Sequence, residues 1–439
     1  MRTSLLSVLA MGAVAVCAQN PIIQTSYTAD PAPYVHNDTV YLYTSHDEDD
    51  ARGFLMRDWL LYTSTDMVNW TDHGAVASLR DFQWGPQENG AWAIQTIERD
   101  GRWYMYCPLH CNNIGVLVSD SPFGPFHDPL GHKLVNQCID DIDPTVWIDD
   151  DGQAYMYWGN PNLYYVKLNR DMTSYSGEIV KNPGGVLPED YQEGPWFYKR
   201  GKWYYMAYAS TCCPEGIGYA MSKKPTGPWR KAGTLMEHYP QSNGNHPGII
   251  TFKGHDYLFG HNYQLHQSLS DVFCERRSVC VAELHYNDDG TIDEVPYWDE
   301  VPELEPVGAV CPFKRVEAET IAWSDGVKSA RRDSVGMVIT HIHNTDYIRV
   351  RNVDFGDGAK RFTAAVASES KSGTIELRLD RLDGTLIGEC QIGSTGGKDK
   401  WLQRSCQVQK IGGRHDLYLV FRGRHKAELF DFDWWRFDK

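Results

Sequence analysis

The sequence has no excess of basic residues, and this absence excludes one large class of partners. Lys and Arg together number 42, against 58 Asp and Glu, so the formal net charge is -16 at pH 7. Nucleic acids bind basic surfaces, because their phosphate backbones are negatively charged. We therefore expect the chain to bind no nucleic acid.

Long apolar runs are absent beyond the N-terminus. A membrane-spanning helix needs about 20 consecutive apolar residues. No segment after residue 20 has such a run, so we expect no membrane span.

The first 20 residues read MRTSLLSVLAMGAVAVCAQN, with one Arg, an apolar run from Leu5 to Val16 and small residues after it. This layout is typical of a secretory signal peptide. It predicts a signal peptide over residues 1–18, cleavage after Ala18, and export of the mature chain to the periplasm or the extracellular space. Lipid anchoring at Cys17 is the alternative, because VAVC faintly resembles a lipobox.

The cysteines do not indicate a metal site. Cys212 and Cys213 are adjacent, without CxxC spacing or a paired His, so they do not resemble a zinc site, and we expect that they do not pair with each other. Removal of Cys17 leaves 10 of the 11 cysteines, and export permits disulfides among them. Cys390 and Cys406 flank a loop in a short β-rich segment and are the best candidate pair.

Aromatic residues, in contrast, are abundant. They make up 13% of the chain, with 15 Trp and 25 Tyr. Aromatic side chains favour β-strands and also stack against the apolar faces of sugar rings. The length of 439 residues suffices for two or three domains with sizeable cores. The composition therefore favours a β-rich protein of more than one domain.

Aromatic hairpins recur along the first 300 residues. Each consists of a strand, a tight polar turn and a second strand, and a further apolar strand follows it. The hairpins read YVHNDTVYLYTS, TIERDGRWYMYC, VWIDDDGQAYMYWG, FYKRGKWYYMAYAS and ITFKGHDYLFGHN. Five units with a period of about 50 residues are the signature of a β-propeller, in which the first strand of each blade lines a central channel.

One residue stands just ahead of the first strand of each unit. These residues, separated by 62, 51, 50 and 53 positions, are Asp30, Trp92, Asp143, Glu193 and His246. In a propeller they would occupy equivalent places and converge at one end of the channel. Glu193 also precedes an apolar hairpin, and burial against aromatic side chains raises the pKa of a carboxyl group.

Three convergent carboxylates predict hydrolysis of a glycosidic bond. A neutral acid protonates the leaving oxygen, while a charged base activates water on the opposite face of the sugar. Calcium binding is the alternative, but calcium loops gather their acids within about a dozen residues, whereas these acids are 113 and 50 positions apart. No Ser nucleophile, Cys-His pair or Gly-rich phosphate loop occupies comparable positions. Trp92 is either a sugar platform or a packing residue, and His246 either holds an ion or water or is a core histidine.

The acidic motifs resemble those of a known family. Asp30 in TADPAPYV, Asp143 in DIDPTVWIDDDGQAYMYWG and Glu193 in EGPWFYKR are similar to the three acidic motifs of glycoside hydrolase family 43, five-bladed propeller enzymes that act on xylan and arabinan. The resemblance covers about residues 20–300. It implies a general base at Asp30, a general acid at Glu193, and Asp143 as the residue that orients the acid and raises its pKa. It also implies inversion of configuration, with the two reacting carboxylates roughly 6.5–9.5 Å apart.

The same resemblance implies further site residues and a substrate class. His246 matches a histidine that contacts a calcium ion or water in the channel, and Arg277 matches an arginine that lines the pocket. The chemistry requires no cofactor. We expect a propeller over residues 19–305 that acts on plant cell-wall polysaccharide or oligosaccharide of the arabinoxylan type, as an exo-acting α-L-arabinofuranosidase. The alternatives are a β-xylosidase of the same family, a sugar-binding propeller without catalysis, and a retaining, fructose-releasing hydrolase.

Residues 306–439 change in character. Polar and apolar residues alternate between Gly-rich turns, which predicts a β-sandwich (jelly-roll) and an all-β protein overall. The segment resembles a carbohydrate-binding module of family 6, which implies a structural Ca²⁺ at Glu317, Glu319 and Asp433. Tyr347 and Trp401 are the candidate sugar clamp. The family's TGG sequence is followed directly by a stacking Trp, whereas this chain has Lys398 there, so a purely structural sandwich is the alternative.

Overall fold

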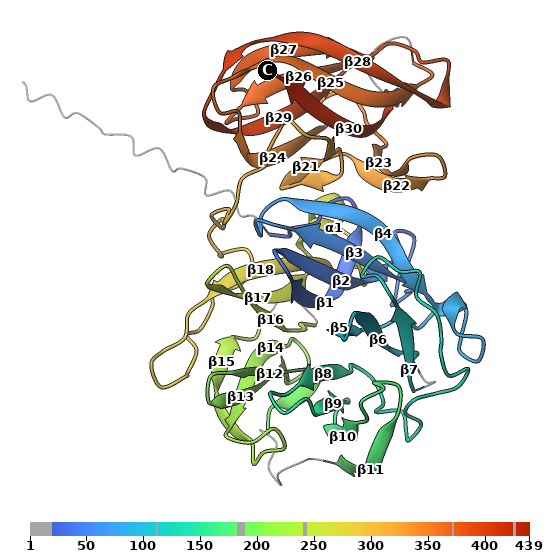
Figure 1. The fold of residues 1–439 in the computed structure, drawn as a ribbon, viewed down its shortest axis with the longest axis vertical. Coiled ribbons are helices and arrows are strands. Elements are labelled where there is room, and N and C mark those ends of the chain that lie inside the picture. Colours follow the sequence, from blue (N-terminus) through green and yellow to red (C-terminus); the bar gives the residue numbers. More distant parts are fainter. Residues whose placement is uncertain (1–19, 111–112, 182–188, 240–243, 371–372, 425–426) are drawn as a thin grey trace, which may run out of the picture.

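The computed structural model describes residues 20–110, 113–181, 189–239, 244–370, 373–424 and 427–439. The predicted signal peptide and Cys17 lie outside these residues. Nearly all regular structure is β: within the described ranges the helical segments are α1 (Gln264–Leu269) and a 3-10 turn over Leu79–Asp81. No helix in the described part of the chain combines the length and apolar character needed to cross a membrane. The prediction of an all-β protein is confirmed (Figure 1).

Five antiparallel sheets form the blades of a propeller. Blade one contains β1 (Tyr27–His36), β2 (Thr39–Asp47), β3 (Asp58–Ser64) and β4 (Trp70–Ser78). Blade two contains β5 (Gln95–Arg99), β6 (Arg102–Pro108) and β7 (Ile114–Ser119). Blade three contains β8 (Thr145–Ile148), β9 (Ala154–Trp158), β10 (Tyr164–Leu168) and β11 (Tyr175–Lys181). Blade four contains β12 (Tyr191–Arg200), β13 (Trp203–Ser210), β14 (Gly216–Ser222) and β15 (Arg230–Met236), and blade five contains β16 (Gly248–Phe252), β17 (His255–Asn262) and β18 (Ser278–Leu284).

The first strand of every blade lies at the centre of the ring. Figure 1 shows these inner strands, β1, β5, β8, β12 and β16, around one axis, with the later strands of each blade farther out. Neighbouring inner strands contact one another, as β1 does with β5 and β16 and as β8 does with β5 and β12. The predicted five-bladed propeller is therefore confirmed, and the starts of its inner strands meet at one end of the axis.

Tight turns fix the register of the hairpins that were visible in the sequence. Arg99 pairs with Arg102 across an Asp100-Gly101 turn whose φ angles are 54° and 83°. Positive φ at both central residues is the geometry of a type I′ turn, whose twist matches that of the flanking strands. The Lys253-Gly254 turn between β16 and β17 has the same geometry, with φ angles of 49° and 86°.

The N-terminal segment closes the ring against blade five. The backbone N–H of Ile22 donates to the carbonyl of Val279 in β18 at 2.9 Å, and that of Thr28 donates to Arg277 at 2.9 Å. The buried side chain of Asn20 accepts from Val281 N–H and donates to the carbonyls of Val281 and Trp298. This closure brings the end of blade five beside the start of β1, where the predicted site lies.

The C-terminal segment is a sandwich of two sheets. One sheet has the order β22 (Lys328–Arg332), β23 (Gly336–Thr340), β30 (Asp431–Asp438), β25 (Ala359–Ser368) and β28 (Gly397–Ile411), with β19 (Val316–Glu317) paired to β30. The other has the order β21 (Trp323–Asp325), β24 (Tyr347–Asp354), β29 (Arg414–Arg422), β26 (Thr374–Leu379) and β27 (Thr385–Gln391). Apolar side chains from both sheets form one core between them, including Val350, Phe362, Leu377, Leu419 and Trp435. The predicted β-sandwich is confirmed, and the predicted boundary at residue 305 falls between β18 and β19.

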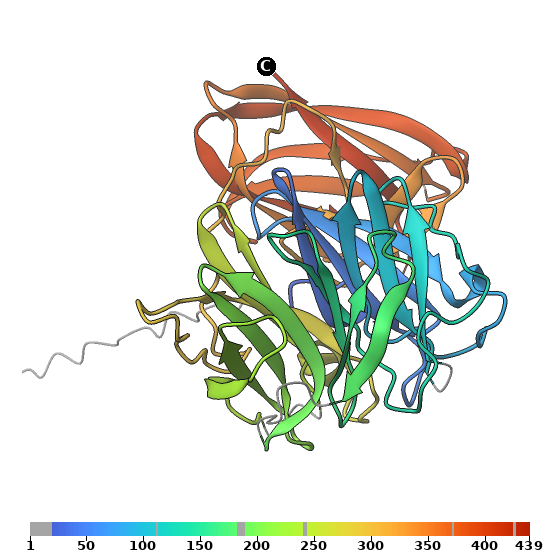
Figure 2. The same cartoon turned by 60° about the horizontal axis from the view of Figure 1, so that its bottom comes forward.

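The sandwich is tied to blade one by paired polar contacts. The short strand β20 (Thr320–Ile321) adds to the outer edge of β4. Asn69 and Arg351 exchange two hydrogen bonds: the Asn69 amide donates to the Arg351 carbonyl at 3.1 Å and accepts from its N–H at 2.8 Å. Ser329 donates to Asp72 at 2.6 Å. Figure 1 and Figure 2 show the sandwich (orange to red) seated beside blade one (blue).

Two expectations about the cysteines need correction. Cys212 and Cys213 form a disulfide with each other. The contrary expectation rested on their adjacency in the chain, whereas the two sulfur atoms are bonded across a single peptide unit, with the two Cα atoms 3.1 Å apart. Cys390 and Cys406 are both free, but their sulfur atoms share a hydrogen bond. The predicted proximity of the second pair is confirmed, and its predicted bond is not.

Candidate active site

The predicted propeller residues gather at one cavity. A space of about 130 Å³ at the end of the axis is lined by all six of them: Asp30, Trp92, Asp143, Glu193, His246 and Arg277. A second space of about 310 Å³ shares Asp30, Glu193, His246 and Arg277 with the first and extends toward Glu215 and the Cys212–Cys213 disulfide. The blades therefore bring residues from positions 30 to 277 to one place, as the repeat predicted.

An unusual backbone conformation aims the acids at the axis. Asp30 and Asp143 have left-handed φ angles of 50° and 54°, and each is followed by a proline. The pairing of β1 with β2 shifts at this point, between Ala29 and Ala32, as expected for a β-bulge, which re-aims a side chain near an active site.

In blade four the equivalent conformation belongs to Gly194, with φ 56°, and not to Glu193. The predicted equivalence is thus wrong by one residue in this blade. The reason is space, because a Cβ atom on Gly194 would lie 2.7 Å from Cδ2 of His246. The acid occupies the preceding position, at a second register shift between Glu193 and Trp196.

Asp30 is held in its charged form. The Nη1 atom of Arg277 donates to Oδ1 of Asp30 at 2.9 Å, and the Asp30 side chain is buried. Burial by itself raises the pKa of a carboxyl group. Here the charges of Arg277, His246 and His261 outweigh burial, so the pKa of Asp30 lies below its ordinary value.

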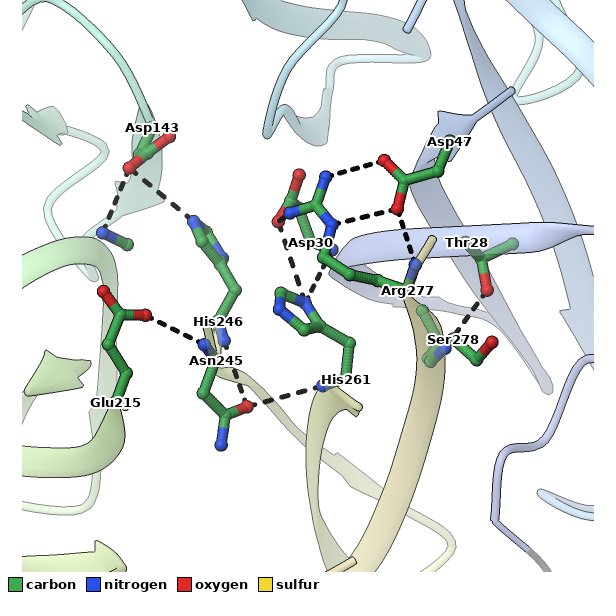
Figure 3. Close-up of polar contacts among 12 residues, drawn as sticks. Thr28, Asp30, Asp47, Asp143, Glu215, Asn245, His246, His261, Arg277 and Ser278 are labelled. Atoms are coloured by element: carbon green, nitrogen blue, oxygen red, sulfur yellow. Dashed lines mark hydrogen bonds and ion pairs between the residues drawn. The ribbon is translucent and has the colours of Figure 1, made fainter. Parts of the chain in front are cut away.

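Asp47 positions Arg277 and was not identified from the sequence. The Arg277 guanidinium donates to both carboxylate oxygens of Asp47, through Nε at 3.0 Å and Nη2 at 2.9 Å, and the Arg277 backbone N–H donates to Oδ2 at 2.8 Å. Such a two-point pair fixes the plane of the guanidinium. The remaining Nη1 atom is thereby directed at Asp30, as Figure 3 shows.

Among the described residues, Glu193 has a neutral hydrogen-bond partner and forms no ion pair. The side-chain amide of Asn160 donates to Oε2 of Glu193. Gln192 donates to Oδ1 of Asn160 at 3.1 Å and so orients that amide. Burial and the negative charge of Asp143 raise the pKa of Glu193 to about 7. Two carboxyl groups at this cavity are therefore tuned in opposite directions, Asp30 toward the charged form and Glu193 toward the neutral form.

Asp143 lies between the acid and the histidine. Its Oδ2 atom accepts from the backbone N–H of Gly194 at 3.2 Å and lies 3.8 Å from Nε2 of His246. Burial alone would lower the pKa of His246, but Asp143 outweighs it and raises that pKa. Nδ1 of His246 has no hydrogen-bond partner among the described residues, so this nitrogen is open to an ion or water in the channel.

Another buried acid, Glu215, was also not identified from the sequence. It is 2% exposed, and its Oε2 atom accepts from the backbone N–H of Asn245 at 2.9 Å. Burial and the neighbouring Glu193 raise the pKa of Glu215 to about 9. An acid directly before an apolar strand was the signal that pointed to Glu193, and GIGYAMS after Glu215 repeats it.

Aromatic rings form one wall of the cavity. Trp92 stacks on His110, with ring centroids 3.9 Å apart and planes 8° apart, and its carbonyl accepts from the indole N–H of Trp59. Phe54 lies across from it, 5.9 Å between centroids, and above the guanidinium of Arg277. One face of Trp92 is therefore covered by His110, which leaves the ring in a fixed orientation at the cavity.

The predicted calcium residues of the sandwich lie near one another. Arg315 pairs with Glu317 at 2.7 Å and with Asp433 at 3.0 Å. Burial raises the pKa of Glu319 to about 9 and, with the nearby charge of Glu317, raises that of Asp433 to about 6. The Oε2 atom of Glu319 is buried without a hydrogen-bond partner among the described residues. This surplus of buried carboxyl oxygen fits a divalent cation.

Tyr347 and Trp401 lie on strands that are not neighbours. Tyr347 begins β24 and lies beside Tyr418, with centroids 6.0 Å apart, whereas Trp401 lies in β28 of the other sheet, opposite Ala367. The structure does not pair the two rings, and a clamp between them stays a prediction. Lys398, at the place of the family's stacking Trp, forms an ion pair of 2.7 Å with Glu428.

Two family matches agree with this division of the chain. Residues 18–292 match glycosyl hydrolases family 43, and residues 317–439 match the carbohydrate binding module of family 6.

Two named relatives match nearly the whole chain, and a third matches a smaller part of it. The arabinoxylan arabinofuranohydrolase of Bacillus subtilis (strain 168) is 31% identical, over 95% of this chain and 92% of the relative. That of Paenibacillus polymyxa is 32% identical, over 95% of this chain and 74% of the relative. A xylosidase/arabinosidase of Bacteroides ovatus is 30% identical, over 64% of this chain and 98% of the relative.

Solved structures show the same architecture. A family 43 arabinoxylan arabinofuranohydrolase from Bacillus subtilis, in complex with cellotetraose, superposes with a TM-score of 0.85 at 30% identity, over 96% of this chain and 98% of that one. An α-L-arabinofuranosidase from Clostridium thermocellum has a TM-score of 0.54 at 36% identity, over 65% and 97%. The chain is a glycosidase that belongs to glycoside hydrolase family 43 and carries a C-terminal carbohydrate-binding module of family 6.

Proposed function

We propose that the protein is an exo-acting, inverting α-L-arabinofuranosidase that releases arabinose from arabinoxylan or arabino-oligosaccharides. The observation that carries this proposal is the pair of oppositely tuned carboxyl groups, Asp30 and Glu193, on one small cavity. Pairs of carboxyl groups whose pKa values are separated by their environments are the usual acid and base of a glycosidase. The two arabinofuranohydrolase relatives that match 95% of this chain support the sugar.

In the proposed mechanism, Glu193 is the general acid. It protonates the glycosidic oxygen as the bond to the anomeric carbon breaks. Asp143 keeps the proton on Glu193 through its negative charge and, through the Gly194 N–H, fixes the backbone that carries the acid. The Asn160 amide occupies Oε2, so the proton that Glu193 transfers is directed to Oε1.

Asp30 is the general base. It accepts a proton from the water molecule that attacks the anomeric carbon from the opposite face. The positive charge of Arg277 keeps Asp30 ionised, but it also lowers the basicity of the Asp30 carboxylate. Asp47 limits this loss of basicity, because its negative charge neutralises part of the arginine charge. Because water attacks directly, each turnover inverts the anomeric configuration.

The shape of the cavity supports removal of single terminal sugars. The innermost space is about 130 Å³ and is bounded by Trp92, Met56 and Ile142. The adjoining space of about 310 Å³ gives the rest of the substrate a way out past Phe54 and Tyr263. A β-xylosidase is the second candidate, because the Bacteroides ovatus relative carries both activities in its name and both sugars are pentoses.

A substrate panel tests the proposal. We expect hydrolysis of p-nitrophenyl α-L-arabinofuranoside and release of arabinose from arabinoxylan, with slower or no hydrolysis of p-nitrophenyl β-xyloside and galactoside. Preference for the xyloside would replace the first candidate by the second. Hydrolysis that survives Glu193→Ala would overturn the assignment of the acid, and absence of all hydrolysis would favour a sugar-binding propeller.

The proposal includes two calcium positions. The unpartnered Nδ1 of His246 supports an ion or water in the channel, and the unpartnered Oε2 of Glu319 supports a structural ion with Glu317 and Asp433. Neither ion takes part in a chemical step. A structural ion in the sandwich would compete with Arg315 for the two outer carboxylates.

The proposed setting is outside the cytoplasm, on plant cell-wall polysaccharide. The signal-peptide pattern of residues 1–18 supports export of the mature chain. Lipid anchoring of the exported protein at Cys17 is the alternative. The family 6 module supports attachment to a polysaccharide. The Lys398–Glu428 pair at the place of a stacking ring supports weak binding of xylan.

A further inference from the structure

Glu215 is a buried carboxyl group at the cavity to which the proposed mechanism gives no role. It lies directly before β14, is 2% exposed and lines the 310 Å³ space together with Asp30 and Glu193. Figure 3 shows its carboxyl group on the side of the site where Asn245, His246 and Asp143 lie. A carboxyl group in such a place is costly to bury and needs an explanation.

The contacts of Glu215 show in which form it is held. One oxygen accepts from the Asn245 backbone N–H at 2.9 Å, and its side chain shares a hydrogen bond with Glu193. Two carboxyl groups can share a hydrogen bond only if one of them carries a proton. No ion pair in the described part of the chain includes Glu215, so nothing favours its charged form except the single N–H.

We propose that Glu215 is a neutral positioning residue for the general acid, whose O–H donates a hydrogen bond to Glu193 and stabilises the carboxylate that forms when Glu193 gives up its proton. The inference rests on the proposed role of Glu193. Because the pKa of Glu215 is raised to about 9, it keeps its proton over the range in which Glu193 titrates.

The proposed role of Glu193 as the general acid explains why its hydrogen-bond donors are neutral groups and not cations. An arginine at this place would stabilise the carboxylate so strongly that the group would lose its proton before reacting, as Arg277 does to Asp30. Neutral donors stabilise the charge less and leave the acid protonated near neutral pH. Asn160 and Glu215 supply two such donors, one from blade three and one from blade four.

The test compares Glu215→Gln with Glu215→Leu. The Gln side chain can still accept from Asn245 through Oε1 and donate to Glu193 through Nε2, so we expect kcat on arabinoxylan oligosaccharides within about threefold of wild type. The Leu side chain removes the donor, and a lost hydrogen bond to a charged group lowers kcat about 10- to 100-fold. We also expect the alkaline limb of the Leu variant's pH profile to move to higher pH, because the Glu193 carboxylate has lost a donor.

The leaving group separates a role through Glu193 from a general structural role. A 2,4-dinitrophenyl arabinofuranoside has a leaving group that needs little protonation, so we expect the Leu variant to hydrolyse it at close to the wild-type rate. An equal loss on both substrates would overturn the inference, since it would indicate a damaged pocket. A Gln variant as inactive as the Leu variant would also overturn it, because a neutral hydrogen-bond donor at this place would then not be sufficient for the role.

A third variant distinguishes a failure of the inference about Glu215 from a failure of the proposed function. We expect Glu193→Gln to lose activity on the oligosaccharide far more than on the dinitrophenyl substrate. If it does, and Glu215→Leu behaves as wild type with an unmoved pH profile, only the inference about Glu215 fails. If Glu193→Gln keeps full activity on the oligosaccharide, the assignment of the general acid fails and the inference fails with it.

Discussion

Nη1 of Arg277 lies 2.9 Å from Oδ1 of Asp30, although 247 positions separate the two residues in the chain. Closure of the ring between the N-terminal segment and β18 creates this contact, because the N–H of Thr28 binds the Arg277 carbonyl beside the start of β1. The ring closure therefore sets the charge of the proposed base, in addition to holding the first and last blades together.

Replacement of Arg277 tests this dependence. In Arg277→Met the positive charge is gone, so the pKa of Asp30 rises. The base is active only when ionised, so the acidic limb of kcat/KM moves to higher pH, and we expect a loss of about tenfold or more at pH 5, since each pKa unit is a factor of ten.

Asp47→Asn is the matched control, because it leaves Arg277 in place with less neutralisation. The pKa of Asp30 then stays low or falls, and the acidic limb does not move upward. Movement of both variants in the same direction would contradict the assignment of Arg277 as the residue that sets the charge of Asp30.

The pKa of Glu193 predicts the other limb of the pH profile. An acid that must be protonated loses activity as pH rises through its pKa, which is about 7. We expect kcat/KM on an oligosaccharide to fall about tenfold for each pH unit well above 7. In Asp143→Asn a negative neighbour is removed, so the limb moves to lower pH. A limb that stays at the same pH in this variant would exclude Asp143 as the residue that raises the pKa.

Gly194 offers a steric test with a close control. Gly194→Ala places a Cβ atom 2.7 Å from the His246 ring, at a φ of 56°. Gly201→Ala has the same backbone conformation, with φ 58°, but meets nothing within 4 Å. Both variants incur about 1 kcal/mol of backbone strain.

Only Gly194→Ala produces a steric clash, because the His246 ring lies against the position of its Cβ atom and nothing lies within 4 Å of the Cβ position at Gly201. We therefore expect a fall in kcat of about 100-fold for Gly194→Ala, as reacting groups are displaced, and near wild-type kcat for Gly201→Ala. Equal kcat values for the two variants would show that the contact with His246 does not hold the acid in place.

Calcium and pH are expected to act together on stability. Folding raises the pKa of Glu319 from about 4.5 to about 9, so the folded protein binds this proton more tightly than the unfolded chain does. Its contribution to stability is complete below about pH 4.5 and is lost as pH rises toward 9.

A bound cation would replace the proton, so addition of Ca²⁺ raises the melting temperature more at pH 8 than at pH 5, by about 2 °C or more. The measurement is a thermal melt with Ca²⁺ or with chelator at both pH values. Glu319→Gln is expected to abolish the calcium effect, and an unchanged calcium effect in this variant would exclude Glu319 as a ligand.

The propeller and the main acids could be predicted because both leave a local signal. Tight turns such as Asp100-Gly101 mark every hairpin, and an acid followed by proline marks the left-handed backbone positions at Asp30 and Asp143. These signals repeat at blade spacing, so the positions of distant residues follow from the fold.

The supporting residues could not be predicted in the same way. Asp47 contacts Arg277 from the end of β2, and Asn160 contacts Glu193 from the loop after β9. Each of these contacts joins two blades and has no pattern within either segment. Glu215 did carry a local signal, but it follows Cys212-Cys213-Pro214, which has the composition of a turn.

The first-formed product anomer tests the central claim most directly. Proton NMR can follow hydrolysis of p-nitrophenyl α-L-arabinofuranoside from the start, before mutarotation mixes the anomers. Water activated by Asp30 attacks the face opposite the leaving group, so β-L-arabinofuranose is expected to appear first. Initial appearance of the α anomer would mean that a protein carboxylate attacks the sugar, and it would contradict the roles given to Asp30 and Glu193.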